Sequence, residues 1–135
     1  MKRISNRAVL AGSLLATGTA PVVAHHSVSA EFDPDRPIEF TGTVKQTEWV
    51  NPHGFMQVEV TEDDGAVSIY RIQIGAPISL YRQGWGPDSV PQGTVVTFQG
   101  IRARNPDSRN VNGTVTGPDG EALWRGEGPS GSLTR

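Results

Sequence analysis

Three histidines occupy two places in the chain, and imidazole is the commonest metal ligand among side chains. His25 and His26 are adjacent, and His53 lies in the Asn-Pro-His-Gly segment at 51–54. Cleavage after Ala24 would make His25 the first residue of the mature protein. The free α-amine and the imidazole of that residue can then chelate one metal ion, and His53 offers a further nitrogen. These residue types and positions predict a metal site.

The nitrogen donors decide which metal such a site would prefer. An unperturbed α-amine titrates near ~8 and imidazole near ~6.5, so a metal ion can displace the proton from either group at neutral pH. A tetragonal set of nitrogen ligands favours Cu(II), and Zn(II) is the competitor. We therefore predict copper(II) as the cofactor, zinc(II) as the second choice, and His25, His26 and His53 as the metal ligands. Two roles stay open for His26, a fourth nitrogen ligand or a residue facing solvent.

The start of the chain has the three parts of an export signal. It opens with Lys2, Arg3 and Arg7, continues through an apolar or small run at 8–18, and ends on Ala24. The apolar run is shorter than the ~20 residues that a membrane-spanning helix needs. The pattern predicts a bacterial protein that is periplasmic or secreted and that is not an integral membrane protein.

The amino-acid composition argues against nucleic acid as a partner and excludes disulfides. Removing the signal leaves 111 of the 135 residues, enough for one domain with a modest core. The signal carries three basic and no acidic residues, so the formal charge falls from −2 to −5. An acidic chain whose only remaining lysine is Lys45 argues against nucleic acid, which needs clustered basic residues. The chain has no cysteine, so its stability must come from the core or from a bound ligand rather than from disulfides.

The elements that must position these histidines are mostly strands. Alternating apolar and polar residues predict strands at 38–50, 55–61, 66–74 and 94–104, a short fifth strand at 111–115 and a sixth at 123–124. Pro77 and Gly84 bracket about two helical turns between the third and fourth strands. Gly42, inside the first strand, indicates a bulge or a bend.

This order of elements is typical of the OB type of barrel. We predict an all-β fold, a small five- to six-stranded OB-like Greek-key barrel with one short helix between strands three and four. An open β-sandwich or another small barrel is the alternative. The expected organisation is a signal peptide at 1–24, an extended N-terminal arm at 25–37, the β-barrel domain at 38–125 and a disordered tail at 126–135.

Several of these segments resemble one protein family. The similar segments are Ala24-His25-His26-Ser27, Glu31-Phe32-Asp33, Thr41-Gly42-Thr43-Val44, Glu48-Trp49-Val50-Asn51-Pro52-His53, and Gly84-Trp85 followed by Gly93-Thr94-Val95-Val96. They are similar to a family of small exported bacterial proteins classed as a domain of unknown function, over roughly residues 24–123. The His-His-Ser start and the Trp-x-Asn-Pro-His segment are the most specific parts. The resemblance implies export and a small β fold, and it supplies no activity and no catalytic residues.

Three functional interpretations follow. The first is a periplasmic metal-binding protein that handles or delivers copper. The second is a metal-free module that binds a small molecule or a periplasmic protein, with the histidines as polar residues of an arm and a turn. The third is an enzyme with an oxidative copper centre. We expect binding rather than catalysis, because the chain has no Ser-His-Asp signature, no phosphate-binding glycine loop and no cysteine nucleophile.

Three other groups of residues have both a structural and a functional interpretation. The acidic group at 62–64 is too short for a calcium loop and is read as a hairpin turn. Arg102 and Arg104, two residues apart on one strand, would bind an anion or keep a strand face soluble. The aromatic residues would line a ligand cleft or form the core; they are Trp49, Phe55, Tyr70, Tyr81, Trp85 and Phe98.

Overall fold

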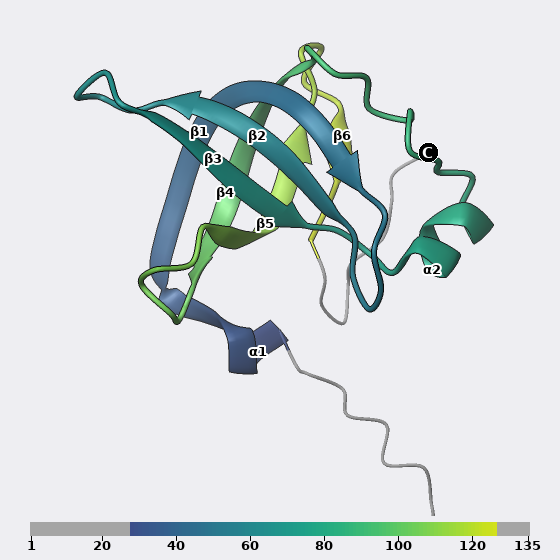
Figure 1. Cartoon of the computed structure of the whole chain (residues 1–135), viewed down its shortest axis with the longest axis horizontal. Coiled ribbons are helices and arrows are strands. Elements are labelled where there is room, and N and C mark those ends of the chain that lie inside the picture. Colours follow the sequence, from purple (N-terminus) through teal and green to yellow (C-terminus); the bar gives the residue numbers. More distant parts are fainter. Residues whose placement is uncertain (1–27, 127–135) are drawn as a thin grey trace, which may run out of the picture.

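A computed structural model describes residues 28–126 as six strands and two short helices (Figure 1). The elements in chain order are α1 (Val28–Glu31), β1 (Phe32–Glu48), β2 (Phe55–Thr61), β3 (Val67–Gln73), α2 (Pro77–Arg82), β4 (Val95–Ala103), β5 (Asn110–Thr116) and β6 (Ala122–Trp124). No helix in this part of the chain is long and apolar enough to cross a membrane.

The strands close into a barrel. Hydrogen-bonded neighbours follow the order β3-β2-β1-β4-β5-β6, and β3 also pairs with β5. The β3–β5 pairing is parallel, with Arg71 opposite Asn110 and Ile72 opposite Val111, and the other pairings are antiparallel. Strands one to five therefore form the ring β1-β2-β3-β5-β4 with α2 between β3 and β4, which is the arrangement of an OB barrel. The predicted all-β, OB-like fold is confirmed, and β6 is a short sixth strand beside β5.

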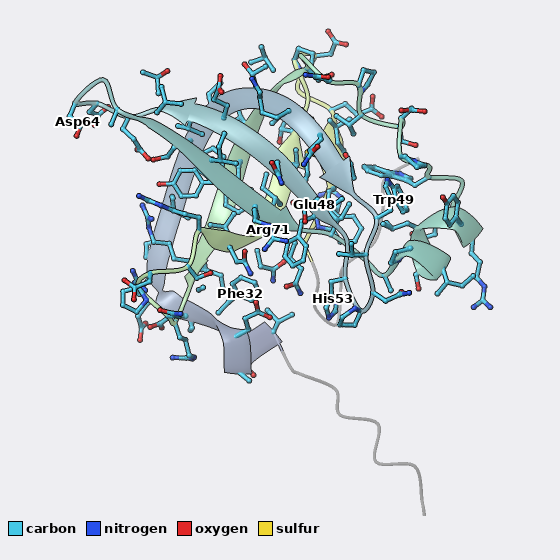
Figure 2. All side chains as sticks on the ribbon, in the orientation of Figure 1. Phe32, Glu48, Trp49, His53, Asp64 and Arg71 are labelled. Atoms are coloured by element: carbon cyan, nitrogen blue, oxygen red, sulfur yellow. The ribbon has the colours of Figure 1, made fainter. Side chains whose placement is uncertain are left out.

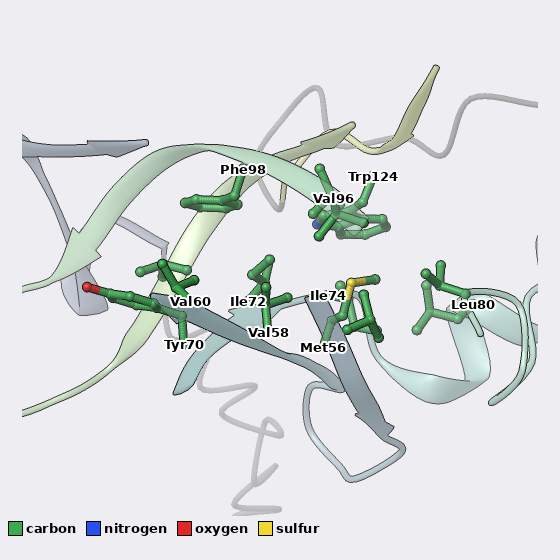
Figure 3. Packing of buried hydrophobic residues seen from close by; sticks show 14 residues of the cluster. Met56, Val58, Val60, Tyr70, Ile72, Ile74, Leu80, Val96, Phe98 and Trp124 are labelled. Carbon is green, nitrogen blue, oxygen red and sulfur yellow. The ribbon is translucent and has the colours of Figure 1, made fainter. Parts of the chain in front are cut away.

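The barrel is filled by the inward side chains of alternating residues. Every second residue of a strand faces the same side, and the side that faces inward here is apolar (Figure 3). Leu80 of α2 is fully buried against this core, and Trp85 packs partly against it. Ile78 and Tyr81 of the same helix are 58% and 55% exposed. The fully buried side chains include Val44, Met56, Val58, Tyr70, Ile72, Ile74, Val96, Phe98, Val111 and Val115.

Two adjacent strands approach closely through a pair of glycines. Gly100 of β4 lies opposite Gly113 of β5. A Cβ on Gly113 would lie 2.2 Å from the carbonyl oxygen of Gln99. Gly42 has a similar role in β1, because a Cβ there would lie 2.4 Å from the Glu59 carbonyl oxygen of β2. A bulge or a bend was expected at Gly42, and the register of β1 against β2 shifts between Val44 and Gln46, around Lys45.

The segment before the barrel differs from the extended arm expected at 25–37. Its described part begins with the helical turn α1 and continues directly into β1, which starts at Phe32 rather than near 38. Phe32 pairs with Ala103 of β4, and its side chain is completely buried. Arg36 secures the same region, since its Nη1 donates a hydrogen bond of 2.7 Å to the Ala103 carbonyl. The register of the β1–β4 pairing shifts between Phe32 and Pro37, and such an irregular stretch accommodates proline.

Candidate functional site

His53 lies in the loop that joins β1 to β2, and its side chain is half-buried (Figure 2). The loop has a cis peptide bond between Asn51 and Pro52. Two backbone hydrogen bonds attach its last residue to the chain after β3: the Gly54 N–H donates to the Gly75 carbonyl at 3.2 Å, and the Ile74 N–H donates to the Gly54 carbonyl at 2.9 Å. His53 therefore directly precedes a backbone position that is held from both sides.

A polar network on the outer face of the barrel lies beside this loop. Met56 and Ile72 point inward, so their neighbours Gln57 and Arg71, which are opposite each other in register, point outward. Arg71 Nη2 donates a hydrogen bond of 2.7 Å to Glu48 Oε2, at the end of β1. Gln57 Nε2 donates a short hydrogen bond to the other oxygen of the same carboxylate. Both carboxylate oxygens of Glu48 thus have a partner on β2 or β3.

Arg71 has two more contacts that join separate parts of the barrel. Its guanidinium lies 4.0 Å from the centre of the Phe55 ring, two residues after His53. Its Nη1 donates a hydrogen bond of 3.1 Å to Asn110 Oδ1 on β5. Asn110 in turn donates through Nδ2 to Glu31 Oε1 of α1 at 3.4 Å. The network Glu31–Asn110–Arg71–Glu48 therefore links α1 to the base of the hairpin that carries His53.

The network also changes the acidity of Glu48. The hydrogen bond from Arg71 is the main cause that holds the pKa of the Glu48 carboxyl below its usual value of 4.5. Partial burial of the carboxylate acts in the opposite direction, and the hydrogen bond from Gln57 and the charge of Arg71 add to the lowering. Glu48 is therefore an ionised, hydrogen-bonded anion at neutral pH, and its oxygens are occupied by protein donors.

The predicted metal ligands are only partly within the described chain. His25 and His26 lie outside residues 28–126, and His53 lies inside. Among residues 28–126, no group of three or more His, Cys, Asp or Glu side chains is arranged to hold a metal ion. A site at His53 built from three such side chains would therefore need ligands outside residues 28–126, and the predicted ligands His25 and His26 are outside this range.

The carboxylates near α1 have partners within the protein. Asp33 Oδ1 lies 3.6 Å from Arg104 Nη1 and accepts a hydrogen bond from the Asp35 backbone N–H at 3.2 Å. Arg104 also donates through Nε to the Ser29 carbonyl at 3.1 Å. Arg104 thus attaches α1 and the start of β1 to the end of β4.

An apolar surface lies on the other side of the His53 loop. The rings of Trp49 and Tyr81 are 5.0 Å apart, which brings the start of the loop against α2. Val50, Ile78 and Tyr81 are 47%, 58% and 55% exposed. The indole Nε1 of Trp49 is buried and has no hydrogen-bond partner within residues 28–126. Of the aromatic residues expected to line a cleft or to form the core, Tyr70 and Phe98 belong to the core, and Trp49 packs partly against it and contacts Tyr81 at this surface.

Sequence reasoning missed the residues of the polar network. Glu48, Arg71 and Asn110 lie on three different strands, and no local motif relates them. The one usable signal was the alternation of β3, which puts Arg71 on the outer face between two inward residues. Its partners depend on the β1–β2 register and on the parallel β3–β5 pairing, and neither can be read from a single chain without its fold.

Comparison with known proteins gives the chain's relationship and no activity. No curated protein and no solved structure matches it. One family model, described as a family of unknown function, matches residues 12–114, which reach from before α1 to within β5. This agrees with the resemblance of the His-His-Ser start and of the Trp-x-Asn-Pro-His segment. The chain belongs to this family of unknown function, DUF6152.

Proposed function

We propose that this protein is an exported β-barrel protein that binds and handles copper(II), with zinc(II) as the second choice. Its ligands are His25, with its α-amine after cleavage behind Ala24, together with His26 and His53. The protein is periplasmic or secreted, and binding rather than turnover is its task. An amine and two or three imidazoles form a set of nitrogen donors of the kind that Cu(II) prefers.

One observation carries this proposal. The first described turn of the chain, α1, is joined through Glu31 and Asn110 to Arg71, which contacts Glu48 and Phe55 on either side of the His53 loop. Figure 2 has the start of α1 and His53 on the same lower side of the barrel. The described chain therefore begins on the side of the barrel that carries the loop histidine, and this supports the proposal.

The fold makes the proposal stricter than the sequence did. The sequence left about a dozen residues between His25 and the first strand, whereas the described structure begins at Val28, three residues after His25. Three residues span at most about 10 Å of extended chain. If the proposal is correct, His25 and His53 must meet within that reach of the start of α1.

The test is calorimetric titration of the processed protein, beginning at His25, with Cu(II) and then Zn(II). We expect a single Cu(II) site in the sub-micromolar range and weaker Zn(II) binding. His53→Ala should weaken Cu(II) binding at least about tenfold, the loss of one of three or four nitrogen ligands. Asn51→Ala, in the same loop and without a nitrogen ligand to lose, is the matched control and should leave binding unchanged.

A second variant tests the amine. In a form acetylated at the amino terminus, the His25 α-amine is an amide and cannot join the chelate ring, so Cu(II) binding should weaken as strongly as it does in His53→Ala. Electron paramagnetic resonance of the Cu(II) complex should show nitrogen couplings that decrease in number in both variants. Binding that is micromolar or weaker and indifferent to both changes would refute the proposal.

The second candidate function is a metal-free module that binds a small molecule or a periplasmic protein. The specific observation in its favour is the apolar surface of Val50, Ile78 and Tyr81 around Trp49. Exposed apolar residues that gather in one patch mark interaction sites more often than scattered ones do. Weak copper binding whose affinity is unchanged by His53→Ala would favour this function over the first.

A further inference from the structure

The far end of the β3–β5 seam has a cluster of cations around one aromatic ring. The guanidinium carbons of Arg102 and Arg109 lie 5.7 Å and 5.5 Å from the centre of the Tyr70 ring. Arg109 Nη1 also donates a hydrogen bond of 3.4 Å to the Tyr70 hydroxyl, which itself donates to Glu62 Oε1 at 3.0 Å. Figure 3 shows the hydroxyl of Tyr70 at the edge of the packed core, pointing away from the other core side chains.

The register explains why these residues meet. Arg102 pairs with Val111 of β5, and Val111 pairs with Ile72 of β3. Arg102 has the same parity in β4 as Val96 and Phe98, whose side chains are buried in the barrel. Its guanidinium therefore lies toward the barrel end at Tyr70, and the residue is half-buried. Arg109 immediately precedes β5 at the same seam, where its carbonyl accepts the Arg71 N–H at 3.0 Å.

Arg102 and Arg109 differ from Arg71 and Arg104 in having no direct ion pair with a described residue. Arg71 has Glu48, and Arg104 has Asp33. Within residues 28–126, no carboxylate lies within ion-pair distance of Arg102 or Arg109, and Glu62 reaches Arg109 only through the Tyr70 hydroxyl. Arg102 has contact with the Tyr70 ring but no hydrogen bond to a described residue. A guanidinium has five N–H donors, and a half-buried cation without an anion loses part of its hydration without replacement.

We propose that this end of the barrel binds a small oxyanion, a carboxylate or a phosphate group, between Arg102 and Arg109. Two oxygens on the same carbon or phosphorus atom can accept two parallel hydrogen bonds from one guanidinium. The two guanidiniums beside the Tyr70 ring also give this end of an acidic protein a local positive potential that attracts an anion. Phe40 is half-buried and stacked on this ring, with 4.6 Å between the ring centres, so an apolar body attached to the anion has a surface to contact. The site is independent of the proposed copper function because it shares no residue with it.

The test is a titration followed by nuclear magnetic resonance of the ¹⁵N-labelled protein with inorganic phosphate and, separately, with benzoate. Sodium chloride keeps the ionic strength constant, because weak anion binding is sensitive to screening. We expect saturable shifts of the Arg102 and Arg109 side-chain Nε–H signals and of the neighbouring amides, with half-saturation at about 1 mM. Tighter binding of benzoate assigns the site to carboxylates with an apolar body, and tighter binding of phosphate assigns it to phosphate groups.

Variants separate a site from a general effect of charge. Arg102→Gln should weaken binding about tenfold, the loss of one charge-assisted hydrogen bond. Arg82→Gln removes the same charge from an exposed position on α2 and should leave binding unchanged. If Arg102→Gln is poorly folded, Arg102→Lys keeps the charge, removes the fork, and should still weaken binding by severalfold. Shifts that do not saturate by about 50 mM, or equal weakening by Arg102→Gln and Arg82→Gln, would overturn the proposal.

Discussion

Replacing Arg71 by glutamine tests the network that joins α1 to the His53 hairpin. Arg71 contributes a charge-assisted hydrogen bond of 2.7 Å to Glu48 and a stacking contact of 4.0 Å with Phe55. The side chains of Arg71 and Glu48 are 37% and 22% exposed, so the pair lies between a surface ion pair worth about 0–1 kcal/mol and a buried charged hydrogen bond worth about 1.5–3 kcal/mol. We expect Arg71→Gln to lower the free energy of unfolding by about 1–2 kcal/mol.

The measurement is a double-mutant cycle with Glu48→Gln and Arg71→Gln, followed by urea unfolding and by heating. For a domain of about 100 residues, a loss of 1 kcal/mol lowers Tm by roughly 4–8 °C. The coupling between the two residues should be about 1 kcal/mol at pH 7. The exposed pair Lys45–Glu59, with 3.2 Å between its charged atoms and both side chains 41% exposed, is the control and should couple by less than about 0.5 kcal/mol.

The coupling between Glu48 and Arg71 should weaken as the pH is lowered. The pKa of Glu48 is below 4.5 in the folded state, so the native state resists protonation more than the unfolded chain does. The stability from this pair is therefore complete above about pH 4.5 and is lost as pH falls through the folded pKa. A coupling near zero at pH 7, or one that is the same at pH 3 as at pH 7, would show that the pair does not contribute as the geometry implies.

Three further substitutions test the packing by chemical denaturation. Gly113→Ala should cost at least about 3 kcal/mol, because its Cβ would lie 2.2 Å from a backbone oxygen, whereas Gly86→Ala, with open space around it, should change stability by less than about 0.5 kcal/mol; equal costs would contradict the close strand contact. Phe32→Ala should cost about 3–5 kcal/mol as a fully buried aromatic residue, and a cost below about 1 kcal/mol would mean that α1 and the start of β1 are not packed on the barrel. Tyr70→Phe should cost about 0.5–1.5 kcal/mol through loss of the hydrogen bond to Glu62, and no change would mean that water replaces it at no cost.

Local patterns were enough to predict most elements of this fold. The second strand was expected at 55–61, where β2 lies, and the predictions at 66–74 and 94–104 differ from β3 and β4 by one residue at each end. Alternation of apolar and polar residues depends only on which side faces the core, so one chain is sufficient to reveal it. The helix after Pro77 was also local, because proline and glycine act on their own backbone.

The start of β1 shows where local patterns fail. Pro34 and Pro37 indicate an extended arm rather than a paired strand or a helix, yet Phe32–Glu48 is one strand, whose pairing with β4 is irregular between Phe32 and Pro37. The deciding contacts are those of Phe32 with Ala103 and of Arg36 with the Ala103 carbonyl, 71 and 67 positions along the chain. The local tendency of two prolines against strand pairing is weaker than the free energy gained by burying a phenylalanine side chain. That burial exists only once β4 is in place.

The sequence alone determined most element types and the order that leads to an OB barrel, because each depends on residue identity and short spacing. Only the tertiary structure decided that β3 closes on β5, which brings Arg71 to Asn110 and Arg102 toward Tyr70 and Arg109. The physical reason is that, in a closed barrel, the register between neighbouring strands decides which side chains meet. Hydrogen bonds between segments that are distant in the sequence set that register.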